Sequence, residues 1–529
     1  MGDSVPAALR RRVVQSFKLQ GLTLQSGATS VLAEVLEPYR DSGDLDEIVE
    51  RIVEAVQQQP LSSSLIGRET VLAAVEEVNE ASDADKEKAL VVIDAFEIPK
   101  FTYNPDQKRF LPVPRSSLSL HSSAGDKAAL FRSRYTLILQ QTARHELFAP
   151  TTFGQSASTD DSNSRFQLHK VEGLLGQTGF VDKVIVLGIL TRIKEGKVHL
   201  EDPTGCVELD LANTVFHTGL FVESSLVLAE GVFEEKVFHV SAVGFPPPEP
   251  PSVTRNYFGN VNFFGGPSTV CAKSSEKLQA MLAENEDAMF VFLSDIFLNE
   301  PRVMERLATL FSGYSEAPPT AIVLMGDFSS APYGPLTNQK LREDFKSLAE
   351  LMMRFPTLVK NSQFLFVPGP QDPGPGNLLP RPPIPSVLTS DLTSRVPTAK
   401  FCSNPVRIQF CTREIVVFRD DILGKMCRNC VRFPTKSADL PTHFTKTLLS
   451  QGHLCPLPLH SRPVYWAFDH ALQLHPLPDL VVIGDKCDPF TVTSGETTVA
   501  NTGSFLRSDF EFKVYMPSSG QVEDSKIAN

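Results

Sequence analysis

Residues 321–328 read Ala-Ile-Val-Leu-Met-Gly-Asp-Phe, a continuous apolar run that ends in glycine and aspartate. A short run of this kind predicts a strand buried on both faces, as in a parallel sheet covered by helices. Similar runs occupy residues 289–293, 364–367 and 480–483, and helical patterns at residues 303–311 and 341–353 lie between them. This alternation predicts an α/β domain over residues 251–529.

Polar residues follow each of these predicted strands. The tails are Ser294-Asp295-Ile296-Phe297, Gly326-Asp327-Phe328-Ser329-Ser330, Gly369-Pro370-Gln371-Asp372 and Gly484-Asp485-Lys486-Cys487, with Gln451-Gly452-His453 between the last two. Ligands of open α/β sheets bind at the carboxyl ends of the strands. We therefore expect a site, or the remnant of one, where these tails meet.

The order of these tails resembles that of the calcineurin-like metallophosphoesterases. Enzymes of that family carry DxH, GDxxD, GNHD, a lone histidine and GHxH after such strands, and these side chains hold two metal ions. In this chain Asp295, Gly326, Asp327, Gly369 and Asp372 match the motifs, whereas Phe297, Ser330, Pro370, Gln371, Asp485 and Cys487 stand where ligands or the general acid are expected. The resemblance thus implies the phosphoesterase fold with its metal site dismantled.

The substitutions bear directly on catalysis. A hard divalent ion needs several oxygen and nitrogen ligands at once, and phenylalanine and proline offer none. The histidine that serves as general acid is also missing. We predict no catalytic residue, no metal and no cofactor, and we interpret Asp295 and Asp327 as acceptors of backbone N–H bonds. The alternative is an active phosphoesterase or nuclease whose missing ligands come from His443, His453 or His460.

The first 97 residues have the pattern of a small helical domain. Apolar side chains recur at helical spacing in five groups: Leu9, Val13 and Phe17; Val31, Leu32, Val35 and Leu36; Ile48, Ile52, Val53 and Val56; Val71, Leu72 and Val75; and Leu90, Ile93 and Phe96. Residues 98–165 are predicted to be a linker, with one isolated helix at residues 126–142 and a mobile polar loop at residues 155–164.

Residues 166–250 have the pattern of an OB-fold barrel. Short strands are predicted at residues 184–190, 198–202, 207–210, 226–232 and 237–243, and the longest connection lies between the third and the fourth. Arg192, Lys194 and Lys197 are basic, but no aromatic ladder accompanies them. A protein-docking face is therefore favoured, and a module that binds single-stranded DNA stays as the alternative.

An OB barrel followed by a degenerate phosphoesterase domain resembles the second, non-catalytic (B-type) subunits of the eukaryotic replicative DNA polymerases. The N-terminal helices, which are similar to the lid of AAA+ ATPases, and the stretches at residues 263–267, 426–434 and 488–490 point to the epsilon polymerase within that group. The resemblance implies an accessory subunit in DNA replication and repair in the nucleus. The implied partners are the C-terminal zinc-binding region of the catalytic chain, the small histone-fold subunits, the replicative helicase through the N-terminal domain, and DNA only within the complex.

Composition agrees with a protein-binding role. The formal net charge is -12, whereas a protein that grips duplex DNA by itself usually has a basic surface. No apolar run is long enough to span a bilayer, and no signal-peptide pattern opens the chain, so an intracellular protein is expected. Cys427 and Cys430 form one C-x-x-C, but a structural zinc site normally needs a second pair, so buried thiols are favoured.

Overall fold

The computed structural model forms two compact units, residues Met1–Lys88 and Ala89–Asn529. The structure describes residues 7–19, 22–36, 49, 52–53, 55–56, 65–68, 70–72, 74–75, 89–149, 166–177, 179–331, 334, 337–434 and 438–527. The loop predicted at residues 155–164 lies outside these residues. None of the described helices is both long enough and apolar enough to cross a membrane.

The first unit is helical, as predicted. Helices α1 (Ala7–Leu19) and α2 (Ser26–Leu36) match the first two apolar stripes, and the described residues of the third and fourth stripes are also helical. A two-residue parallel ladder joins β1 (Thr23–Leu24) to β2 (Leu65–Ile66). Phe17, Leu32 and Val56 are fully buried in one common core, because each stripe turns its apolar face inward.

The prediction of a fifth helix, from the stripe Leu90, Ile93 and Phe96, is wrong. Residues Leu90–Asp94 form strand β3, which pairs antiparallel with β17 (Val406–Phe410) in the second unit. The division between the units consequently falls after Lys88, nine residues earlier than predicted. Three of the five residues of β3 are β-branched, and pairing with β17 satisfies the backbone groups that a helix would have satisfied internally.

The predicted linker is also more structured than expected. Strands β4 (Lys100–Asn104) and β5 (Arg109–Val113) form a hairpin, and α5 (Ala124–Arg144) is a helix of 21 residues that starts at a capping box formed by Ser123 and Asp126. The helix is not isolated. Leu130 is buried in one of the apolar cores of the second unit, and Arg134 makes a buried ion pair with Asp469.

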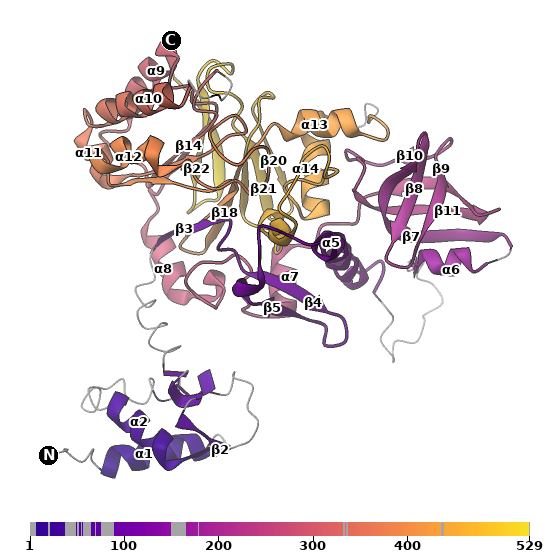
Figure 1. Ribbon diagram of the computed structural model, residues 1–529, viewed down its shortest axis with the longest axis horizontal. Helices are drawn as coiled ribbons and strands as arrows, with labels where there is room; N and C mark the ends of the chain where they lie inside the picture. Colours follow the sequence, from indigo (N-terminus) through magenta and orange to yellow (C-terminus); the bar gives the residue numbers. More distant parts are fainter. Residues whose placement is uncertain are drawn as a thin grey trace. The chain divides into compact units, whose positions relative to one another are not determined.

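The OB barrel has the predicted strands. They are β7 (Val181–Lys194), β8 (Lys197–Asp202), β9 (Gly205–Asp210), β11 (Leu226–Glu234) and β12 (Val237–Gly244). Two strands of two residues each add to the sheet: β6 (Leu168–His169) pairs with β7, and β10 (Val215–Phe216) pairs with β12. The five-residue helix α6 (Val171–Leu175) contacts β9. The pairing of β12 with β9 closes the ring, so these five strands leave no open edge between them. Figure 1 shows the barrel in magenta at the right.

The rest of the second unit is a sandwich of two six-stranded sheets with helices outside both. One sheet has the order β16-β15-β14-β13-β22-β23 and the other β20-β21-β19-β18-β17-β3. The first contains β13 (Phe290–Leu293), β14 (Ala321–Met325), β15 (Gln363–Val367), β16 (Ala399–Phe401), β22 (Glu511–Met516) and β23 (Gln521–Lys526), and the second contains β18 (Arg413–Arg419), β19 (Leu480–Gly484), β20 (Phe490–Ser494) and β21 (Thr497–Asn501) besides β3 and β17. The predicted α/β layering is confirmed.

Three apolar layers hold this sandwich together. Side chains of β14, β15, β17, β18 and β19 interdigitate between the two sheets. The outer face of the first sheet is covered by α9 (Pro301–Gly313), α10 (Thr337–Met352), α11 (Pro356–Asn361) and α12 (Ser386–Arg395), and that of the second by α13 (Ile422–Asn429), α14 (Leu440–Gln451) and the 3-10 helix η4 (Trp466–Leu472). Two further helices, α7 (Pro251–Phe258) and α8 (Glu276–Glu284), lie between the barrel and β13 in sequence. Burial on both faces explains why all five residues of β14 are apolar.

Candidate functional site

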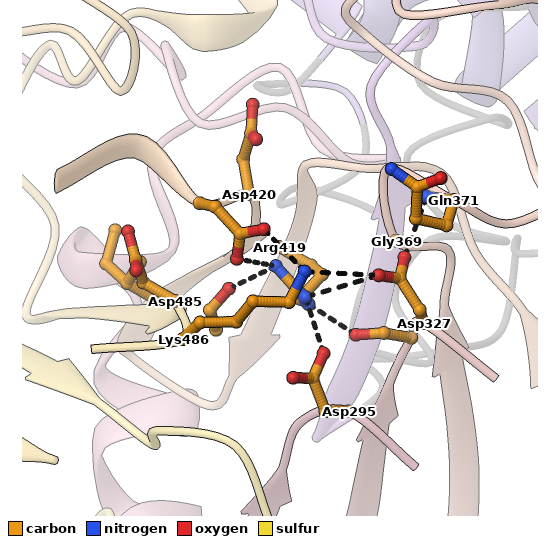
Figure 2. A network of polar contacts seen from close by, with 12 residues as sticks. Asp295, Asp327, Gly369, Gln371, Arg419, Asp420, Asp485 and Lys486 are labelled. Atoms are coloured by element: carbon orange, nitrogen blue, oxygen red, sulfur yellow. Dashed lines mark hydrogen bonds and ion pairs between the residues drawn. The ribbon is translucent and has the colours of Figure 1, made fainter. Parts of the chain in front are cut away.

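The carboxyl ends of strands from both sheets meet at one place, and the tails predicted from the motifs lie there. Asp295 follows β13, Gly326 and Asp327 follow β14, and Gly369 follows β15, all from the first sheet. The second sheet contributes Arg419, the last residue of β18, and the loop after β19. Figure 2 shows Asp295, Asp327 and Arg419 turned toward one another.

A fully buried guanidinium occupies the centre of this arrangement. Nη2 of Arg419 donates to Oδ1 of Asp295 at 2.5 Å and lies 3.6 Å from Oδ2 of Asp327. Nη1 donates to Oδ1 of Asp421 at 2.9 Å and to the carbonyl oxygen of Gly484 at 2.8 Å, and Nε donates to the carbonyl oxygen of Gly326. The side chain of Arg419 has no exposed surface, and each of its three nitrogens has a partner.

A second cation closes the site toward solvent. Nζ of Lys486 lies 2.8 Å from Oδ2 of Asp421 and 3.9 Å from Oδ2 of Asp327, and a third of its side chain is exposed. Three carboxylates, those of Asp295, Asp327 and Asp421, therefore face two protein cations. Burial disfavours a charged guanidinium, but these carboxylates outweigh it and raise the pKa of Arg419.

Asp327 and the third retained aspartate, Asp372, accept hydrogen bonds from backbone amides. Oδ1 of Asp327 accepts the N–H of Gln371 at 2.8 Å, and Asp372 accepts the N–H groups of Phe328 and Gly369 at 2.8 and 2.7 Å. These bonds tie the loop after β14 to the loop after β15. Burial, together with the nearby charge of Asp327, raises the pKa of Asp372 to about 7, and burial also raises the pKa of Asp327.

Glycine is required where these two loops touch. A Cβ on Gly326 would overlap the Asp372 carboxylate and lie 2.6 Å from the amide nitrogen of Gly369, and a Cβ on Gly369 would overlap Asp327. Any side chain at either position would push the loops apart. The retained glycines of the family motifs thus serve the packing of the loops in this chain.

The remaining residues from the motifs lie in other environments. Phe297 is buried in the apolar core of the first sheet, and exposed Ser330 hydrogen-bonds with Asn299 and Glu300. Asp485 accepts the N–H groups of Leu423 and Cys487, its pKa is raised by burial, and the half-buried thiol of Cys487 contacts Asn501. His453 belongs to another network, in which its Nε2 lies 3.2 Å from Asp469.

Arg419 was not identified from the sequence. The apolar run at residues 415–418 ends at this arginine, just as the other buried runs end at their aspartates. That position was a usable signal, because β18 pairs parallel with β19 and ends beside it. Asp420, the next residue, points elsewhere and pairs with Lys425 and Arg462 at 2.5 and 2.6 Å.

The residues present do not fit a pair of divalent metal ions. Oxygens of Asp295 and Asp327 already face the Arg419 guanidinium, and Phe297 offers no ligand atom. Within the described residues, Oδ2 of Asp295 is buried without a hydrogen-bond partner, and no group of three or more His, Cys, Asp or Glu side chains could hold a metal ion. A single unpaired carboxylate oxygen supplies only one ligand, whereas a divalent metal ion needs several.

Comparison with known proteins identifies the family. Models of three families match the chain: DNA polymerases epsilon N terminal over residues 5–78, the OB-fold domain of DNA polymerase epsilon subunit 2-like proteins over residues 124–247, and the B-type subunit of DNA polymerases alpha and epsilon over residues 290–492. DNA polymerase epsilon subunit 2 of Bos taurus is 52% identical over 99% of both chains. The chain belongs to the DNA polymerase epsilon subunit 2 family.

Other relatives give the same result. The human DNA polymerase epsilon subunit 2 is 51% identical over 99% of both chains, and the predicted family is thereby confirmed. Among solved structures, a novel archaeal phosphodiesterase aligns with 45% of this chain and 99% of its own, at 9% identity and a TM-score of 0.25. The match to the OB-fold model begins at residue 124, so it includes α5, a helix within the predicted linker of residues 98–165.

Proposed function

We propose that the chain is a non-catalytic accessory subunit of DNA polymerase epsilon that scaffolds the C-terminal region of the catalytic subunit. The observation that carries the non-catalytic part is the position of Arg419. A phosphoesterase needs carboxylates that are free to bind metal, whereas here Oδ1 of Asp295 is 2.5 Å from a guanidinium that is itself fully buried. A metal ion could enter only if this cation left first.

The scaffold role is supported by the rigid joint between the OB barrel and the sandwich. His443, Thr447 and Gln451 lie four residues apart along α14, so they project from one face of the helix. They accept the N–H groups of Gly219, Leu220 and Leu226 at 2.8, 2.8 and 2.7 Å, and Gln451 also donates to the carbonyl oxygen of Leu226. We call these three residues the α14 clamp.

The α14 clamp makes the two folded parts one body. Every bond runs from a buried side chain to barrel backbone, and a buried polar group left without a partner costs about 1–3 kcal/mol. Residues Ala89–Asn529 accordingly behave as a single compact unit. A partner chain that touches the barrel and the sandwich at once would meet a surface of fixed shape, which lowers the entropic cost of binding.

The helical unit is the second element of the proposal. We infer that it resembles the lid of AAA+ ATPases and connects the polymerase to the replicative helicase, while the small histone-fold subunits and the zinc-binding region of the catalytic chain complete the assembly in the nucleus. Its own core and its separation at Lys88 support a tether, because a linked binding unit raises the local concentration of its partner.

The test is co-expression of the full chain with the catalytic subunit, followed by purification through the catalytic subunit alone. We expect the two chains to co-purify, and we expect hydrolysis of bis-p-nitrophenyl phosphate with Mn²⁺ to stay at background. Failure to co-purify would reject the scaffold role. Turnover that is lost in Asp327→Ala would instead support the alternative, an active phosphoesterase.

A further inference from the structure

Strand β20 is an edge of the second sheet of the sandwich. Among the described strands it pairs with β21 alone, in an unbroken antiparallel register that ends at the pair Ser494 and Thr497. The two residues between them form a tight turn, in which Gly495 has a φ of +61°. One side of the β20 backbone therefore has no strand beside it.

The open side of β20 presents the backbone groups of Thr491 and Thr493. Hydrogen-bonded and non-hydrogen-bonded pairs alternate along an antiparallel ladder, and the pair that closes a two-residue turn is a hydrogen-bonded one. Ser494 belongs to this closing pair, so Val492 and Phe490 also bond to β21. The N–H and C=O groups of the two threonines consequently point away from the sheet, and both residues are exposed.

The other three edges of the sandwich have protection that β20 lacks. Glu523, Asp524 and Lys526 lie along β23, β16 is only three residues long, and Lys400 donates to the carbonyl oxygen of Val92 in β3 at 3.1 Å. Charged residues and short strands are ordinary means by which proteins prevent pairing at an edge. The sequence of β20 is Phe-Thr-Val-Thr-Ser, without a charge, a proline or a bulge. Its composition thus favours the addition of a strand.

Contacts on both faces hold β20 in place. The rings of Phe444 in α14 and Phe490 meet edge to face with centroids 6.0 Å apart, so α14 packs on one face of the strand. On the opposite face Nζ of Lys513 in β22 donates to Oγ1 of Thr491 at 3.1 Å and also pairs with Asp524. The edge is therefore preformed, which lowers the entropic cost of adding a strand.

Carboxylates lie at both ends of this edge. Asp488 comes two residues before β20 and Glu496 two residues after it, and both are exposed. Within the described residues neither carboxylate has a cation as partner, because Glu496 bonds to the hydroxyl of Ser252 and the charge of Lys513 is balanced by Asp524. An added strand would meet negative charge at each end, where basic side chains are favourable and acidic ones are not.

We propose that β20 receives an extended segment of a partner protein that has uncharged, strand-forming residues between two basic ones. The segment pairs through its backbone with Thr491 and Thr493, and its basic side chains lie beside Asp488 and Glu496. Either strand direction brings a basic residue to each end, because the two carboxylates flank the edge. The inference does not depend on the proposed function, since it uses neither Arg419 nor the α14 clamp.

The test uses the full-length protein and the peptide acetyl-Lys-Val-Thr-Val-Thr-Val-Lys-amide. We expect the peptide to slow hydrogen exchange in residues 488–496, and the peptide concentration at half-maximal protection gives the affinity. The same peptide with N-methyl groups on its third and fourth residues cannot pair along either of its edges and should give no protection. Replacing both lysines of the peptide by glutamine should weaken binding about fivefold, because two exposed ion pairs are lost.

Two variants of the protein separate the backbone from the side chain. Thr493→Pro removes one outward N–H, at a position where an edge strand tolerates proline, and should lower the affinity at least about tenfold. Thr493→Val is the matched control, because it keeps the N–H and a branched side chain, and it should retain the affinity. If Thr493→Pro fails to fold, the N-methylated peptide makes the same comparison on the side of the ligand.

Three results would overturn the proposal. The first is equal protection by the N-methylated and unmodified peptides, or equal affinity of the lysine and glutamine peptides. The second is the absence of protection by any of the peptides. The third is a dimer of the protein that forms without peptide and is lost in Thr493→Pro, which would assign the edge to a second copy of this chain.

Discussion

Nη2 of Arg419 lies 2.5 Å from Oδ1 of Asp295, and the two side chains are 0% and 1% exposed. The arginine ends β18 in one sheet and the aspartate follows β13 in the other, so this ion pair joins the carboxyl ends of the two sheets. In the phosphoesterases that the motifs resemble, metal ions hold the corresponding side chains together. Here a side chain of the protein itself supplies the positive charge.

Replacing Arg419 by methionine should destabilise the second unit severely. The substitution leaves the buried carboxylates of Asp295 and Asp327 without their main countercharge, and losing one partner of a buried pair costs about 3–5 kcal/mol. Urea denaturation at pH 7.5 measures the change in the free energy of unfolding. Arg342→Met is the control: its ion pair with Asp391 at 2.9 Å is half exposed and should contribute less than about 1 kcal/mol. Equal losses in the two variants would contradict a special role for Arg419.

Manganese should not restore the stability of Arg419→Met. Asp295 and Asp327 would be freed, but Phe297 is an apolar core residue and Ser330 faces Asn299 and Glu300, so the coordination sphere stays incomplete. A ligand that binds only the folded state raises the melting temperature in proportion to the logarithm of its concentration. Melting curves from zero to millimolar Mn²⁺ should superimpose, and a rising melting temperature would show that a site remains.

Gly326→Ala should prevent the loops after β14 and β15 from meeting. The added methyl group would overlap the Asp372 carboxylate and press on the backbone of Gly369, which cannot yield like the end of a flexible side chain. We expect a loss of more than about 2 kcal/mol in the free energy of unfolding. Gly313→Ala in α9 is the control, because a Cβ there meets nothing within 4 Å and should leave the stability unchanged or slightly higher.

Gln451→Leu should loosen the joint between the barrel and the sandwich. The variant leaves the N–H and the C=O of Leu226 buried without partners, which costs about 1–3 kcal/mol for each group. Hydrogen exchange should accelerate at the amide of Leu226. Gln339→Leu is the control, because it makes the same substitution at an exposed position of α10. It should leave hydrogen exchange at Leu226 unaltered.

Acid should weaken the second unit through His470 and His475. Burial lowers the pKa of these groups to about 4 and about 3, below the ordinary value of 6.5. The unfolded chain therefore binds more protons than the folded chain between these values. The stabilisation is complete above pH 6.5 and is lost as the pH falls toward 4, by about 1.4 kcal/mol per pH unit for each imidazole.

Asp372 acts in the opposite direction within the same window. Its pKa is raised to about 7, so the folded chain binds a proton that the unfolded chain releases, and this contribution to stability declines as the pH rises from 4 to 7. The comparison that isolates one imidazole is His475→Gln against the unmodified chain. The difference in the free energy of unfolding should change by about 1.4 kcal/mol per pH unit between pH 4 and 6, and a constant difference would exclude His475 as a source of acid sensitivity.

Secondary structure was predicted correctly from the local sequence where a segment has the same environment along its whole length. The run at residues 321–325 is buried on both faces, and β14 has these bounds. Residues 90–96 were misassigned, because Leu90, Ile93 and Phe96 fit a helical period whereas β3 is decided by its pairing with β17, more than 300 residues away in sequence. The helix at residues 126–142 was found, but its burial against η4 was not visible from its own residues.

The candidate site, too, could be predicted only in part from the sequence. The motifs at Asp295, Asp327 and Asp372 could be located because each follows an apolar run, and the prediction that their ligand set is incomplete rests on residue type alone. The cation that pairs with Asp295 and Asp327 could not be located in this way. Arg419 lies 92 residues from Asp327 in sequence, and an arginine at the end of a strand is ordinarily solvated.

The sequence by itself determined that the chain folds into a helical unit, an OB barrel and a two-layered α/β body, and it predicts that a phosphoesterase ligand set would be incomplete. Hydrophobic periodicity and residue chemistry are local properties, so they can be read along the chain. Only the tertiary structure decided that Arg419 pairs with Asp295 and Asp327 and that side chains of α14 bond to the backbone of the barrel. Each of these depends on which distant strand ends and helix faces come together, and the energy of a buried charge or hydrogen bond is set by that partner and by the exclusion of water.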